Sequence, residues 1–170
     1  MSADLILVLS MVMGLAAYGL IAKWHAMPVL VALPRARALE PLLLVHCFRF
    51  IGLAFLIPGV TSQRLDPRFA NPAAYGDLIA ALLAFLGILA LRLRWRTAIP
   101  LVWLFNIEGT LDLLNAVTQG LRYTEDGMLG ATFFILMVVV PALLVTHVMV
   151  FMILLRREDE NNHPRDKAVA

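Results

Sequence analysis

The side chains best suited to chemistry lie between positions 106 and 120, in the stretch NIEGTLDLLNAVTQG. On a helix with about 100° per residue, Glu108, Asp112, Asn115 and Gln119 fall within a sector of about 60°, while Asn106 points nearly the opposite way. An ionised group near the centre of a membrane span costs about 2.5–3.5 kcal/mol on insertion scales. We therefore expect this polar stripe to face protein or water instead of lipid.

Two other apolar segments supply partners for the stripe. His46 and Arg49 are three residues apart, so they lie on one side of their helix. Counted at about 1.5 Å per residue from the end of the spans that carries most cations, His46, Arg49, Glu108 and His147 lie about 8, 13, 15 and 12 Å deep. The sequence therefore predicts a charged layer that also includes Asp112, in which Arg49 pairs with Glu108.

Such a layer would bind a small or lipophilic ligand, for example a quinone, and its residue types suit acid–base chemistry. The candidate acid–base groups are its carboxyls and imidazoles: Glu108, Asp112, His46 and His147. The candidate ligand-binding side chains are those that can hydrogen-bond beside them: Arg49, Asn106 and Asn115. Because the spacing matches no catalytic motif, the reaction class stays open.

Other interpretations use the same residues. Haem b could be held with His46 and His147 as axial ligands, one from each of two helices. Protons or ions could pass along the stripe from Gln119 to Glu108. The histidines and an Arg49–Glu108 pair could instead be structural, fixing helix register in an accessory or assembly subunit. No metal site is predicted, because the sequence has no HxxxH or ExxH pair.

Composition defines the environment of the chain. Hydrophobic residues make up 61% of its 170 residues and charged residues only 15%, against about 25% charged in soluble domains. The net charge of +2 is small and its cations flank apolar runs, so no nucleic-acid partner is expected. The single cysteine, Cys47, excludes an intramolecular disulfide and a Cys-ligated iron–sulfur cluster.

Apolar runs of about 20 residues predict an all-α integral membrane bundle of five transmembrane helices. The expected spans are residues 5–22, 41–60, 77–91, 98–117 and 130–155. Asp77 is expected to cap the third span, whose small residues Ala80, Ala84 and Gly87 would let another helix approach closely. Pro141 is expected to bend the fifth span, and residues 61–76 are expected to form a loop.

The distribution of charge predicts domain organisation and orientation. Residues 1–155 would form a single transmembrane domain, and residues 156–170 a charged, disordered cytoplasmic tail. Ten Lys and Arg residues lie near the span ends on one side and three on the other, which predicts an outside N-terminus and a cytoplasmic C-terminus. The expected location is a bacterial-type cytoplasmic (inner) membrane, with the lipid bilayer, a homo-oligomer or another membrane protein as partners.

Overall fold

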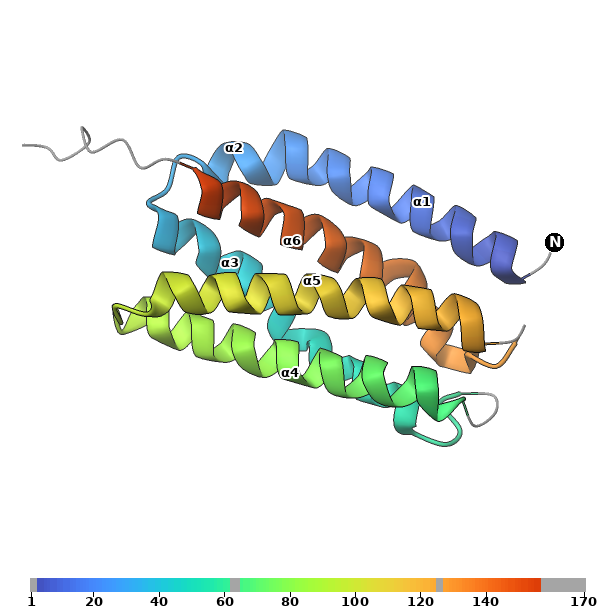
Figure 1. The fold of residues 1–170 in the computed structure, drawn as a ribbon. Coiled ribbons are helices and arrows are strands. Elements are labelled where there is room, and N and C mark those ends of the chain that lie inside the picture. The colour runs from blue at the N-terminus through green and yellow to red at the C-terminus, as the bar shows by residue number, and fades with distance from the viewer. Residues whose placement is uncertain (1–2, 62–64, 125–126, 157–170) are drawn as a thin grey trace, which may run out of the picture.

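The computed structural model describes residues 3–61, 65–124 and 127–156. Within these ranges the chain forms helices and no strand, which confirms the all-α prediction (Figure 1). Most of the tail predicted for residues 156–170 lies outside the described residues, which end at Arg156.

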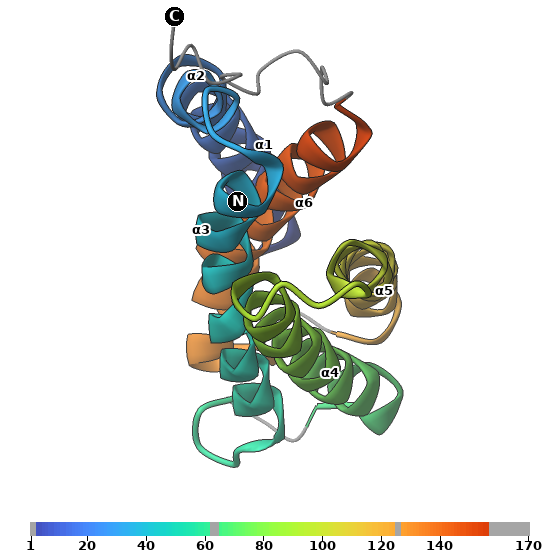
Figure 2. The same ribbon diagram turned by 90° about the vertical axis from the view of Figure 1, so that its left-hand side faces the viewer.

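The first helix is longer than the sequence indicated. Helix α1 (Ala3–Ile21) continues through the π-helical turn η1 (Ala22–Ala26) into α2 (Met27–Leu30). Pro28 does not end it, because the wide π turn just before it accommodates the missing N–H and the ring of the proline. Figure 2 shows α1 at one edge of the bundle, away from α4.

The second segment changes its helix type at the level of the polar residues. Helix α3 (Arg35–Cys47) begins before the predicted start and is followed directly by the 3-10 helix η2 (Phe48–Leu56). A 3-10 helix is more tightly wound than an α-helix and is seldom this long. Arg49 is the second residue of η2, immediately after the change.

Helix α4 (Pro67–Arg92) begins ten residues before the predicted third span. Its N-cap is Asp66, whose carboxylate accepts a hydrogen bond of 2.8 Å from the Arg68 backbone N–H. The Arg68 guanidinium also hydrogen-bonds this carboxylate and holds the pKa of Asp66 below its ordinary value. The predictions of a capping Asp77 and of a loop extending to residue 76 are therefore wrong, and Asp77 lies inside the helix.

Helix α5 (Ala98–Tyr123) runs antiparallel beside α4 along its length (Figure 1). The small residues Ala80 and Ala84 of α4 are fully buried, as expected for a surface of close helix packing. A Cβ at Gly87 would lie 2.8 Å from Leu43 Cδ2 and 3.7 Å from Val102 Cγ2. Helix α4 therefore packs between α3–η2 and α5.

The last segment bends before Pro141. It consists of the 3-10 turn η3 (Gly130–Thr132), the π-helical turn η4 (Ile135–Val139) and α6 (Val140–Leu155). Proline lacks an N–H and clashes with the carbonyl four residues earlier, and a wide π turn relieves both problems. The distortion therefore occurs where the sequence predicted a bend.

Four helical segments of the described residues are long and apolar enough to cross a membrane: Leu5–Leu30, Arg35–Leu56, Pro67–Arg92 and Gly130–Leu155. The fold is thus compatible with a membrane protein. Helix α5 has 26 residues, as many as α4, but its polar stripe lowers its hydropathy and it is not among the four.

Candidate functional site

Arg49 is the centre of a buried polar cluster contributed by four helical segments. Its side chain starts from η2 and only 1% of the residue is exposed. Its Nε donates to Asp77 Oδ1 of α4 at 2.7 Å, and its Nη2 donates to Asp112 Oδ2 of α5 at 2.6 Å. One guanidinium therefore links three segments through two charge-assisted hydrogen bonds, the strongest kind available to it.

The third guanidinium nitrogen connects the cluster to α6. Arg49 Nη1 donates to the Gly109 carbonyl at 3.1 Å and lies 3.3 Å from His147 Nε2. An arginine nitrogen cannot accept, so His147 Nε2 is the acceptor and its proton resides on Nδ1. Nδ1 then donates to Asn106 Oδ1 at 2.7 Å, while Asn106 Nδ2 donates to the His147 carbonyl at 3.2 Å. The network therefore specifies a neutral His147 in one tautomer.

His46 extends the cluster on the side of α3. Its ring contacts the His147 ring, with centroids 4.1 Å apart, and meets Phe105 edge-on at 5.0 Å. Thr146 Oγ1 lies 3.0 Å from His46 Nε2 and directs its own hydrogen toward carbonyls of α6. His46 Nε2–H is therefore the donor, and Nδ1 has no hydrogen-bond partner among the described residues.

Three glycines make room for these polar groups. A Cβ at Gly52 would overlap the Asp77 carboxylate, and one at Gly76 would overlap the Asp112 carboxylate. A Cβ at Gly109 would lie 2.6 Å from Arg49 Nη1. Because each glycine belongs to a different element, the cluster depends on close backbone approach from η2, α4 and α5.

The structure brings most of the predicted site residues together, namely His46, Arg49, Asn106, Asp112 and His147. The predicted Arg49–Glu108 pair is wrong, because Asp77 and Asp112 take that role. Glu108 is partly buried, and its Oε2 has no partner among the described residues. Asn115 is exposed and accepts a 3.4 Å hydrogen bond from Gln119.

Asp77 is the cluster residue that the sequence analysis missed. It stands at the edge of an apolar run, where an N-cap is a reasonable expectation. The signal that places it correctly is the pair Asp66 and Pro67, a capping residue followed by a proline at the first helical position. A helix that begins there carries Asp77 about three turns inside, where an ionised side chain needs a partner.

A haem does not fit between His46 and His147. Axial coordination requires the macrocycle to stand between the two ligating imidazoles, but these rings are already in contact. Both nitrogens of His147 are also engaged, by Arg49 and Asn106. Among the described residues no group of three His, Cys, Asp or Glu side chains is arranged to hold a metal.

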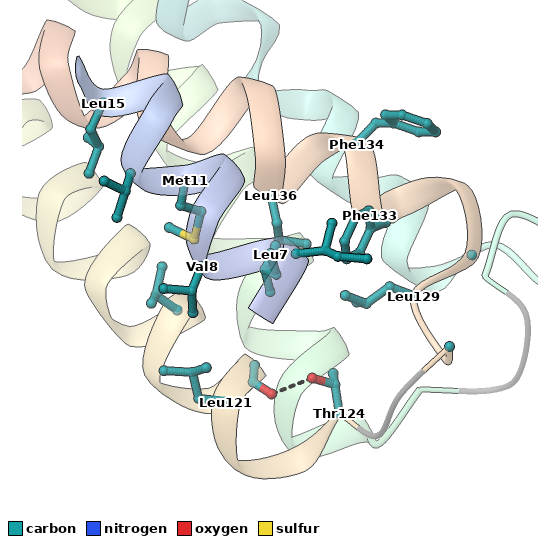
Figure 3. Close-up of a pocket in the computed structure, with 16 residues that line it drawn as sticks. Leu7, Val8, Met11, Leu15, Leu121, Thr124, Leu129, Phe133, Phe134 and Leu136 are labelled. Carbon is teal, nitrogen blue, oxygen red and sulfur yellow. Dashed lines mark hydrogen bonds between the residues drawn. The ribbon is translucent and has the colours of Figure 1, made fainter. Parts of the chain in front are cut away.

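Two apolar clefts lie beside α1. One, of about 440 Å³, runs between Tyr18 of α1, the α3–η2 segment and the η4–α6 segment, and Arg49 forms part of its wall. The other, of about 600 Å³, lies between α1, the end of α5 and residues 127–136 (Figure 3). Thr124, the one polar side chain among the described residues that line this cleft, donates its hydroxyl hydrogen to the Gly120 carbonyl. The second cleft contains none of the predicted site residues.

Fold and site together define a helical bundle of apolar, membrane-compatible helices around a buried arginine cluster. The chain belongs to the family described as domain of unknown function DUF8737, whose model matches residues 6–155. That match extends from α1 to the end of α6. No curated protein and no solved structure shows significant similarity to the chain.

Proposed function

We propose that this protein binds a lipophilic ligand in the cleft between α1, η2 and α6, with the polar head of the ligand next to the Arg49 cluster. The observation that carries the proposal is the double position of Arg49. Arg49 lines an apolar cleft, and its fully buried side chain lies directly behind that wall as the centre of the polar network.

The chemistry of the cleft suits an amphipathic molecule with a long apolar part. Its wall is formed by aliphatic and aromatic side chains such as Leu44, Phe48 and Val139. Tyr18 is the polar side chain on its described surface, and the fully buried side chain of Arg49 lies behind the wall. Pockets for small molecules are typically apolar, with a few polar groups that fix the orientation of the ligand. A hydrocarbon or isoprenoid tail can enter such a cleft sideways from the bilayer.

The charge balance of the cluster favours a head that donates hydrogen bonds. The carboxylates of Asp77 and Asp112 both bond the single guanidinium of Arg49, and Glu108 adds a third carboxyl group on the same helix as Asp112. A quinol hydroxyl or a protonated amine would complement this excess of acceptors, whereas an anionic head would be repelled. Glu108 Oε2 is a buried carboxyl oxygen that lacks a partner within the described residues, and it is our candidate for proton exchange.

The proposal includes the membrane arrangement. Helix α5 crosses beside α4, which gives five spans, because Asp112, the charged group nearest its middle, is paired with Arg49 instead of facing lipid. The end of the bundle with most cations is cytoplasmic and the N-terminus is outside. The protein is accordingly a multi-pass protein of a cytoplasmic membrane.

Filling the cleft tests ligand binding. Ala142 of α6 lines the cleft, so Ala142→Trp should expel the tail and reduce the lipophilic ligand recovered by solvent extraction and mass spectrometry at least about tenfold, equivalent to about 1.4 kcal/mol. Val148→Trp is the matched control, because Val148 lies on the same helix but is 57% exposed. Equal recovery from both variants, or no lipophilic ligand in the wild type, contradicts the proposal.

A further inference from the structure

Positive charge gathers at one end of the bundle. There α2, the start of α3, the turn between α4 and α5 and the end of α6 meet (Figure 1). Among the described residues of this end, seven cations accompany one acid, Glu40, which pairs with Arg92 at 2.9 Å. The seven cations are Lys23, Arg35, Arg37, Arg92, Arg94, Arg96 and Arg156.

Two of these cations hold the end of the bundle together. Arg156 donates to the Val31 carbonyl, and Arg35 Nη2 donates to the Arg156 carbonyl at 2.5 Å. The two contacts join the turn after α2, the start of α3 and the end of α6. The basic surface is therefore built from fixed elements and is continuous across separate parts of the chain.

Four other cations are directed outward. Lys23, Arg37, Arg94 and Arg96 are exposed, and none makes an ion pair or side-chain hydrogen bond within the described part of the chain. Their charge is therefore available to a ligand.

Exposed tryptophans mark the depth of this surface. Trp24 adjoins Lys23 in η1, and Trp95 lies between Arg94 and Arg96 in the turn after α4. Tryptophan is enriched at the level of lipid headgroups, where its ring contacts acyl chains and its N–H reaches polar groups. The outward cations therefore lie where phosphate groups of lipids are found.

We propose that this basic end binds the headgroups of anionic phospholipids in the leaflet that it faces. Charge complementarity carries the proposal, since each cation near an anionic membrane surface strengthens attraction about fivefold. The opposite end has no equivalent surface among its described residues, because Arg68 is paired with Asp66 and leaves Arg122 as an isolated exposed cation. This inference is independent of the ligand proposed for the cleft.

The test uses the full chain reconstituted with equal amounts of phosphatidylglycerol and phosphatidylethanolamine. Lipids retained after mild delipidation are counted by native mass spectrometry. Wild type should retain phosphatidylglycerol preferentially, and R94Q with R96Q should reduce this preference about fivefold or more. R122Q, an arginine replacement at the opposite end, should leave it unchanged. No preference in the wild type, or an equal loss in both variants, overturns the proposal.

Two measurements on the wild-type protein test the proposal whether or not the double variant folds. The preference for phosphatidylglycerol should fall as sodium chloride is raised, because salt screens exposed charges. A preference that is independent of salt overturns the proposal. Displacement of the retained lipid by inorganic phosphate also overturns it, since a phosphate site would not need a lipid. Ala142→Trp should keep the preference, which separates this test from that of the cleft ligand.

Discussion

Arg49 shows how a single ionised side chain can be held inside an apolar bundle. Four of its five N–H groups have acceptors, on Asp77, Asp112, Gly109 and His147. Removing a charge from water is costly, and the loss is offset only when the geometry of the pair is good and the remaining donors are satisfied. The partners come from three other helices, so the side chain and the helix packing depend on each other.

The two aspartates that pair with Arg49 should matter for stability, and the unpaired glutamate should not. Replacing both, as Asp77→Asn with Asp112→Asn, leaves Arg49 without a paired carboxylate and should cost about 3–5 kcal/mol. Glu108→Gln, which makes the same chemical change at a carboxyl that does not bond Arg49, should cost less than about 1 kcal/mol. Denaturant unfolding in detergent measures both. A larger loss for Glu108→Gln would contradict the assigned pairing.

Residue depth could be predicted from the sequence, but partner identity could not. Counting along each span placed His46, Arg49 and His147 at one level, where the structure has them in contact. Glu108 and Asp112 differ by only one helical turn, about 6 Å along the axis and about 40° around it. Such a difference is decided by the rotation of α5 against its neighbours, which depends on packing and not on the sequence of α5 alone.

At the scale of elements, the seam between α4 and α5 determines how closely the carboxylates approach Arg49. The two helices are antiparallel, and Gly76 of α4 lies against Asp112 of α5. Further along the seam, Gly120 of α5 lies 3.4 Å from Phe69 of α4, measured from an ideal Cβ. The helices and the small-residue face of α4 could be predicted from composition. The start of α4 could not be predicted from composition, because Asp66 and Asp77 both suit an N-cap position.

Gly76→Ala should destabilise the protein although alanine favours helices. The new Cβ would overlap the Asp112 carboxylate and force the seam apart, at a cost of about 1–3 kcal/mol typical of overpacking. Gly19→Ala in α1 is the matched control, since a Cβ there meets nothing within 4 Å. The control should gain up to about 1 kcal/mol from helix propensity. Thermal unfolding measures both variants. A melting temperature that shifts in the same direction in both would contradict the close packing of Gly76 against Asp112.

At the scale of the whole molecule, α1 is the peripheral helix. In the most apolar stretch of the span Leu5–Leu30, which contains α1, only 11% of the residues are buried. The corresponding share is 44% in each of the other three candidate spans. Helix α1 packs on η4 and α6, where Gly14 fits against Pro141, and its residues line both apolar clefts. The low burial of α1 is consistent with a bilayer as the surrounding solvent.

Whether α5 crosses the membrane can be tested by finding on which side of the membrane each of its two ends lies. If α5 crosses the membrane, Arg96 before it and Arg122 near its end must lie on opposite sides. In a Cys47→Ala background, which removes the sole native thiol, Arg122→Cys should react with an impermeant maleimide in intact cells. Arg96→Cys should react only after permeabilisation. Labelling of both from one side would show that α5 does not cross, and a reversed pattern would keep five spans but invert the orientation.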